Sequence, residues 1–133
     1  MVFFATVVRA VDHDAIQDYS NGVDELKIGI TYERGEDYDQ ALKWYRLAAD
    51  KGNAAAQKSL GYMYDAGLGV KQDYDQAEKW YRLAADQGNP TAQFNLGVMY
   101  SDGPGVTQDY AQAEKWYRLA ADQGLAIAQA RLV

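Results

Sequence analysis

The sequence predicts an all-α fold: a right-handed solenoid of αα-hairpin repeats, with about three hairpins and a terminal helix. The first observation is a segment that recurs every 36 residues, marked by Trp44, Trp80 and Trp116. The second is another segment of helical periodicity that alternates with it, and the third is the set of capping signals around both. Two-helix units of this length bury their apolar faces by stacking on neighbouring units.

The recurring segment predicts the second helix of each hairpin. It reads DYDQALKWYRLAADKGN from Asp37, DYDQAEKWYRLAADQGN from Asp73 and DYAQAEKWYRLAADQG from Asp109. Each aspartate has a glutamine three residues later, which is typical of a helix N-terminus. The paired aromatic residues in these helices, such as Trp80 and Tyr81, are predicted to pack in the core. Each segment ends in a glycine that we expect in the left-handed conformation: Gly52, Gly88 and Gly124.

The alternating segment predicts the first helix of each hairpin. It reads NAAAQKSLGYMYDAG from Asn53 and NPTAQFNLGVMYSDG from Asn89. Asparagine followed by proline, as at Asn89 and Pro90, is typical of an N-cap and the first helical residue. Apolar and aromatic side chains stand four residues apart in both segments, as the buried face of a helix requires.

The array is expected to span residues 21–133, with units at about 21–52, 53–88 and 89–124 and a partial unit at 125–133. Residues 1–20 form a separate segment, strand-like at VFFATVV and helical from Asp14 to Tyr19. Its apolar run lacks the basic start of a secretory signal and is too short to span a bilayer. The last unit either continues a longer array or caps it. Its apolar residues predict self-association through this C-terminal helix: Leu125, Ile127, Leu132 and Val133.

Composition argues against several classes of function. A net charge of -6 and a pI near 4.6 disfavour nucleic-acid binding, which depends on clustered basic residues. The chain has no cysteine and one histidine, His13, so neither a sulfur-based zinc site nor a Ser-His-Asp relay is expected. We therefore expect no enzyme, no metal and no cofactor, and both cytoplasm and periplasm stay open as locations.

The repeat pattern resembles the Sel-1-like repeat family, whose members are related to tetratricopeptide repeats. The match covers about Gly29 to Leu132 and reads A-Q-x-x-L-G-x-x-Y-x-x-G-x-G-V, then D-Y-x-x-A-x-x-W-Y-x-x-A-A-x-x-G. The first unit lacks four residues of the loop between its helices, so its hairpin is predicted to be tighter. The pattern is carried by Gln57, Leu60, Gly61, Tyr64, Gly67, Gly69, Val70, Tyr74, Ala77, Trp80, Tyr81, Ala84, Ala85 and Gly88, and again 36 residues later.

The resemblance implies a concave groove for a protein or peptide partner, lined by the first helix of each hairpin. Positions counted from Leu60 and Leu96 give the candidate partner-binding residues. The apolar members of this set have an alternative role, which is to pack one helix against another. The candidates are Leu26, Ile30, Glu33, Lys58, Tyr62, Asp65, Phe94, Val98 and Ser101.

The sequence therefore favours an interaction module, acting as an adaptor or assembly scaffold. One alternative is a structural repeat array that associates with itself. A remote alternative is a hydrolase acting on cell-wall material, because some cysteine-rich relatives are associated with such substrates. This chain lacks their paired cysteines, so that role is not carried over.

Overall fold

A computed structural model of the protein describes residues 21–103 and 105–132. The strand-like run and short helix predicted in residues 1–20, His13 and Val133 lie outside the described residues. The described part contains seven helices and no strand, which confirms the all-α class. The helices are α2 (Val23–Arg34), α3 (Tyr38–Asp50), α4 (Ala54–Ala66), α5 (Tyr74–Asp86), α6 (Pro90–Asp102), α7 (Tyr110–Asp122) and α8 (Ala126–Arg131).

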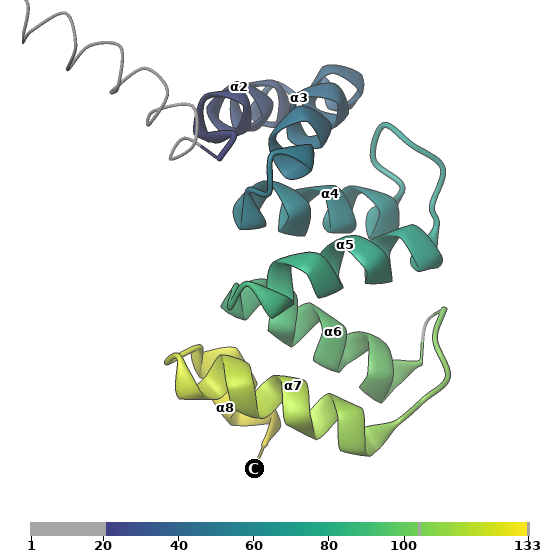
Figure 1. Cartoon of the computed structure of the whole chain (residues 1–133). Helices are drawn as coiled ribbons and strands as arrows, with labels where there is room; N and C mark the ends of the chain where they lie inside the picture. The colour runs from purple at the N-terminus through teal and green to yellow at the C-terminus, as the bar shows by residue number, and fades with distance from the viewer. Residues whose placement is uncertain (1–20, 104, 133) are drawn as a thin grey trace, which may run out of the picture.

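The helices stack as hairpins along one axis, as Figure 1 shows. The hairpins are α2–α3, α4–α5 and α6–α7, and α8 packs on α7. We call α2, α4, α6 and α8 the first helices and α3, α5 and α7 the second helices. Each second helix also packs against the first helix of the next hairpin, a contact that we call the hairpin junction. The predicted helical repeat solenoid is thereby confirmed.

Side chains cap the helices where the sequence predicts. Asp73 Oδ1 accepts a hydrogen bond from the backbone N–H of Gln76 at 3.1 Å, and Asp37 and Asp109 accept the equivalent bonds. Asn89 Oδ1 accepts from the backbone N–H of Ala92 at 2.9 Å. These bonds satisfy N–H groups that have no partner inside the helix. The three predicted terminal glycines have φ between 91° and 94°.

The first hairpin is tighter than the next two, as predicted. Three residues, 35–37, separate α2 from α3, whereas seven separate α4 from α5 and α6 from α7. The longer loop after α4 lies against the preceding hairpin. A Cβ atom on Gly69 would lie 2.7 Å from the carbonyl carbon of Tyr38, so this approach requires glycine.

Small residues line the contacts between helices. At Gly61 a Cβ atom would lie 2.6 Å from Cδ1 of the fully buried Tyr81, so glycine allows α4 to approach α5 closely. Trp80 and Trp116 are 7% and 6% exposed, which confirms their predicted place in the core, whereas Trp44 of the first hairpin is only partly buried. Buried alanines recur with the repeat: Ala41, Ala77 and Ala113; Ala48, Ala84 and Ala120; Ala56, Ala92 and Ala128.

Candidate functional site

The nine predicted partner-binding residues all lie on first helices. Helix α2 carries Leu26, Ile30 and Glu33, α4 carries Lys58, Tyr62 and Asp65, and α6 carries Phe94, Val98 and Ser101. None of the nine is fully buried, and Tyr62 is the most exposed of them at 48%. We call the surface that these residues form the first-helix face.

Three apolar members of this face also hold the hairpins together. Leu26 packs against the central core cluster and against the N-terminal cluster around Tyr45, and Ile30 packs against the N-terminal cluster. Phe94 lies on Tyr117 with ring centroids 5.6 Å apart and also contacts the cluster around Ala120. Their side chains are therefore only partly available to a partner. Tyr62 and Lys58 belong to none of these clusters.

A hollow of about 380 Å³ brings residues of three hairpins together. Glu33 comes from α2, Lys58 and Tyr62 come from α4, and the remaining lining comes from α4 and α6. Its lining offers a carboxylate, an ammonium group, hydroxyls and an amide, which are the groups that orient a polar peptide. Sequence register did not single out the other three lining residues: Ser59, Thr91 and Asn95.

Two acidic residues of the face are engaged inside their own hairpins. The Tyr45 hydroxyl donates to the Glu33 carboxylate, and the Tyr81 hydroxyl donates to Asp65 Oδ2 at 3.2 Å. Burial raises the pKa of both tyrosines well above the usual range. Burial also raises the pKa of Asp65, against the opposing effect of the hydrogen bond from Tyr81. Both carboxylates thus position a second helix, and Glu33 also lines the hollow.

A ladder of glutamines crosses the hairpin junctions, and sequence reasoning missed its role. Gln93 is 4% exposed and donates from Nε2 to the backbone carbonyl of Ala85 at 3.2 Å. Its Oε1 accepts from Gln123 Nε2 at 2.9 Å. Gln57 and Gln129 make the equivalent bonds to carbonyls of α3 and α7. A polar residue recurring every 36 residues within an apolar helix face was the signal available in the sequence.

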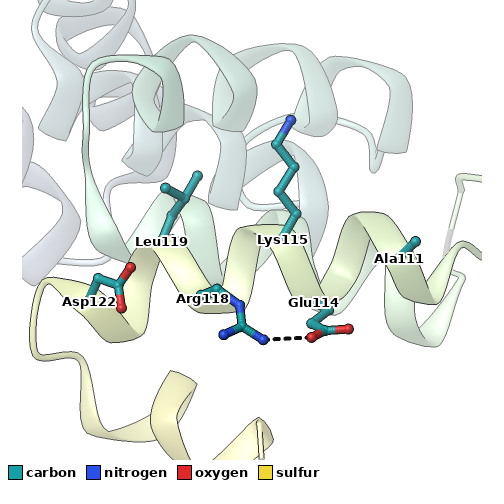
Figure 2. A pocket seen from close by; sticks show the side chains of 6 residues that line it. All are labelled: Ala111, Glu114, Lys115, Arg118, Leu119 and Asp122. Carbon is teal, nitrogen blue, oxygen red and sulfur yellow. Dashed lines mark hydrogen bonds and ion pairs between the residues drawn. The ribbon is translucent and has the colours of Figure 1, made fainter.

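A second hollow, of about 390 Å³, lies along α7 alone. Figure 2 shows its six lining side chains along the helix, with Lys115 and Leu119 pointing away from the joined pair Glu114 and Arg118. The equivalent pair in α5, Glu78 and Arg82, binds the hydroxyl of Tyr100 on α6. The Glu114–Arg118 side of this hollow therefore lies on the junction side of α7, and the hollow is separate from the first-helix face. It is lined by Ala111, Glu114, Lys115, Arg118, Leu119 and Asp122.

Within the described ranges, no three His, Cys, Asp or Glu residues are grouped so that they could hold a metal ion. No helix of the described part is long and apolar enough to cross a membrane.

Stacked αα-hairpins with a partly exposed first-helix face of mixed apolar and polar side chains define a helical-repeat module. The chain belongs to the Sel1 repeat family, whose model matches residues 25–53, 54–89 and 90–125. No curated protein matches the sequence.

Solved structures share the fold. A Sel1 repeat protein from Oxalobacter formigenes is 38% identical with a TM-score of 0.81; the match covers 86% of this chain and 48% of that one. A protective antigen of uropathogenic Escherichia coli with an SLR fold is 44% identical with a TM-score of 0.78, over 80% of this chain and 24% of that one. This chain therefore spans less than half the length of either protein.

Helicobacter pylori cysteine rich protein B has the same fold at 19% identity, with a TM-score of 0.74. That match covers 96% of this chain and 95% of the other.

Proposed function

We propose that the protein binds a protein or peptide partner through the first-helix face and acts as an adaptor or assembly scaffold rather than as an enzyme. The observation that carries the proposal is the hollow of about 380 Å³ shared by three hairpins. It places the half-exposed ring of Tyr62 beside Lys58 and Glu33. An exposed aromatic side chain with charged groups around it is typical of a binding hot spot.

The packing behind this face supports the proposal. The glutamine ladder and the bonds from Tyr45 and Tyr81 fix the first helices relative to the second helices. A face held in place before binding loses little conformational entropy when a partner docks. Opposite charges at Glu33 and Lys58 favour a partner with both acidic and basic side chains.

The proposal is tested with peptides selected against the whole chain from a random displayed library. Each selected peptide is titrated against wild type, Tyr62→Ala and the control Leu83→Ala. Leu83 is 42% exposed on the second helix α5, so the control removes a similar apolar surface elsewhere. We expect Tyr62→Ala to weaken binding about tenfold or more and Leu83→Ala to leave it unchanged. The reverse pattern would place the binding surface on the second helices.

Self-association is a second candidate, favoured by two side chains near the ends of the described array that are more exposed than their counterparts in its middle. Tyr32 on α2 holds the repeat position of Tyr100 and is 36% exposed. Arg118 on α7 holds the position of Arg82, and its side chain is 63% exposed against 43% for Arg82. A junction between copies would join Tyr32 to Arg118, at the part of α7 that precedes its contact with α8.

Sedimentation equilibrium at rising protein concentration tests this candidate. Association that Tyr32→Phe or Arg118→Gln weakens would support it. A monomeric mass throughout would count against it. The exposed Ile127 of α8, at 54%, offers the alternative contact predicted from the sequence. Association that only Ile127→Ser weakens would point to that helix instead.

A further inference from the structure

The three second helices place a tyrosine at the same repeat position, and its surroundings change along the array. Tyr45 donates to Glu33, and Tyr81 donates to Asp65. A neutral side chain of the next hairpin lies beside each hydroxyl: Ser59 beside Tyr45 and Asn95 beside Tyr81. Burial raises the pKa of each tyrosine, and the neutral neighbour acts in the opposite direction. Each of these two tyrosines thus has a carboxylate and a neutral neighbour.

The charges are reversed at the third tyrosine, Tyr117. Ser101 stands at the repeat position of the carboxylates, and Arg131 stands at the position of the neutral neighbours. Tyr117 is 5% exposed, and its hydroxyl is buried without a hydrogen-bond partner among the described residues. The Arg131 guanidinium carbon lies 5.9 Å from the centroid of the Tyr117 ring. At this position Ser101 therefore replaces the carboxylate, and a cation replaces the neutral neighbour.

A cavity of about 330 Å³ opens at this position. Ser101, Tyr117 and Arg131 supply its hydroxyls and its positive charge, and Ala113 and Leu132 supply apolar walls. Tyr110 also lines the cavity. Buried polar groups are almost always hydrogen-bonded to protein or to water, so the unpartnered hydroxyl of Tyr117 can bond to a group that enters this cavity.

Two carboxylates near the cavity are already engaged. Glu114 lines it, and its Oε1 lies 2.7 Å from Nη2 of Arg118 in an ion pair. Asp102 Oδ1 is 4.0 Å from Nη1 of Arg131, and both side chains are about half exposed. Water weakens an ion pair as exposed as this one. The guanidinium of Arg131 therefore stays available to an anion that is placed closer to it.

We propose that this cavity binds a carboxylate group of the partner. The carboxylate accepts hydrogen bonds from the hydroxyls of Tyr117 and Ser101 and pairs with the guanidinium of Arg131. It thereby fills the place that Glu33 and Asp65 fill in the first two hairpins. The proposal rests on the proposed function, because it assigns one chemical group of the partner to the α6–α8 end of the first-helix face. The group comes either from an acidic side chain or from a peptide C-terminus.

Matched tyrosine variants test the missing acceptor by urea denaturation. Tyr81→Phe breaks the bond to Asp65 and is expected to lower the denaturation midpoint. Tyr117→Phe removes a hydroxyl that has no partner and is expected to leave the midpoint unchanged or to raise it. Ser101→Asp restores the carboxylate of the repeat and is expected to raise the midpoint. Equal losses in Tyr81→Phe and Tyr117→Phe would overturn the proposal.

Carboxylate binding is measured by NMR titration of the whole labelled chain at constant ionic strength. Propionate is expected to shift the Tyr117 ring and Arg131 Nε–Hε signals saturably, and propionamide is expected to have no such effect. Ser101→Asp should abolish the shifts, and Arg131→Gln should weaken binding about tenfold, since charge-assisted bonds are the stronger ones. Equal responses to the two compounds, or no saturable response to propionate, would contradict the proposal.

Two blocked tripeptides distinguish the source of the carboxylate. One carries a central glutamate and an amidated C-terminus, and the other carries a central glutamine and a free C-terminal carboxylate. The peptide that binds more tightly identifies the source, and failure of both peptides to bind would overturn the site as a peptide-binding site.

If Tyr62→Ala abolishes partner binding while every carboxylate titration fails, the proposed function survives without this site. If propionate binds while Tyr62→Ala has no effect, the site survives without the proposed face.

Discussion

The glutamine ladder allows a quantitative test of how the hairpins depend on one another. Replacing Gln93 by methionine keeps a long unbranched side chain of similar size and similar helix propensity. The change removes both hydrogen bonds of Gln93, to the Ala85 carbonyl at 3.2 Å and from Gln123 at 2.9 Å. The same replacement at Gln129, an exposed position, removes only the bond to the Ala121 carbonyl. Gln129→Met is therefore the matched control.

The two variants differ in the number and burial of the bonds that they lose. Each hydrogen bond contributes about 0.5–1.5 kcal/mol net, so the loss of two predicts a decrease of about 1–3 kcal/mol in the unfolding free energy for Gln93→Met. The Ala85 carbonyl keeps its bond from the backbone N–H of Gly88, so it does not become an orphaned acceptor. Gln129→Met is expected to cost about 0.5–1 kcal/mol, because its single bond is partly solvated.

Urea denaturation followed by helical circular dichroism and tryptophan fluorescence measures both values. We expect a lower midpoint for Gln93→Met than for Gln129→Met, with similar slopes for the two variants. Equal midpoints would refute the reasoning, because they would mean that the burial of Gln93 and its second bond, to Gln123, contribute nothing beyond the single bond of the exposed glutamine.

Three further predictions concern the core, the hairpin junction and the pH dependence of stability. Gly61→Ala should lower the melting temperature, because overpacking against Tyr81 costs about 1–3 kcal/mol and exceeds the gain in helix propensity of about 1 kcal/mol. An unchanged or higher melting temperature would contradict the close packing of α4 on α5. Arg82→Met should lower stability to urea because Arg82 binds the next hairpin, whereas Arg118→Met should not; equal losses would mean that the junction bond is not the cause. The pKa of Asp65 is raised in the folded state, so the folded chain binds its proton more tightly than the unfolded chain does. This stabilisation is complete below the unfolded pKa of Asp65 and is lost as the pH rises through the folded pKa. The unfolding free energy of wild type relative to Asp65→Asn should therefore fall between acid and neutral pH, and urea titrations that show a rise would contradict the assignment.

The hairpins could be predicted from the sequence because their signals are local and repeated. Asp73 and Asn89 start helices through bonds to residues only three positions away, and Gly88 ends one through its own backbone conformation. The loop length between α2 and α3 is likewise set by a short stretch of chain. Such features do not depend on which helix lies opposite.

The candidate site was predictable only in part, because its chemistry depends on pairs of residues far apart in the sequence. The repeat register predicts that Tyr62 and Phe94 lie on first helices. It does not predict that Phe94 packs against Tyr117 while Tyr62 is exposed. The sequence likewise predicts Ser101 as a contact for a partner. Arg131 reaches the ring of Tyr117, which lies 14 residues earlier in the chain, only because α8 packs on α7. The same packing places Arg131 in one cavity with Ser101.

The account depends most on the claim that a partner docks on the first helices. A library-selected peptide carrying a nitroxide spin label tests this claim directly, because the label broadens NMR signals of the residues close to it. The account predicts broadening at Lys58, Tyr62 and Asn95, with the outer sides of α3, α5 and α7 unaffected. Broadening confined to those second helices would show that the partner binds the opposite face.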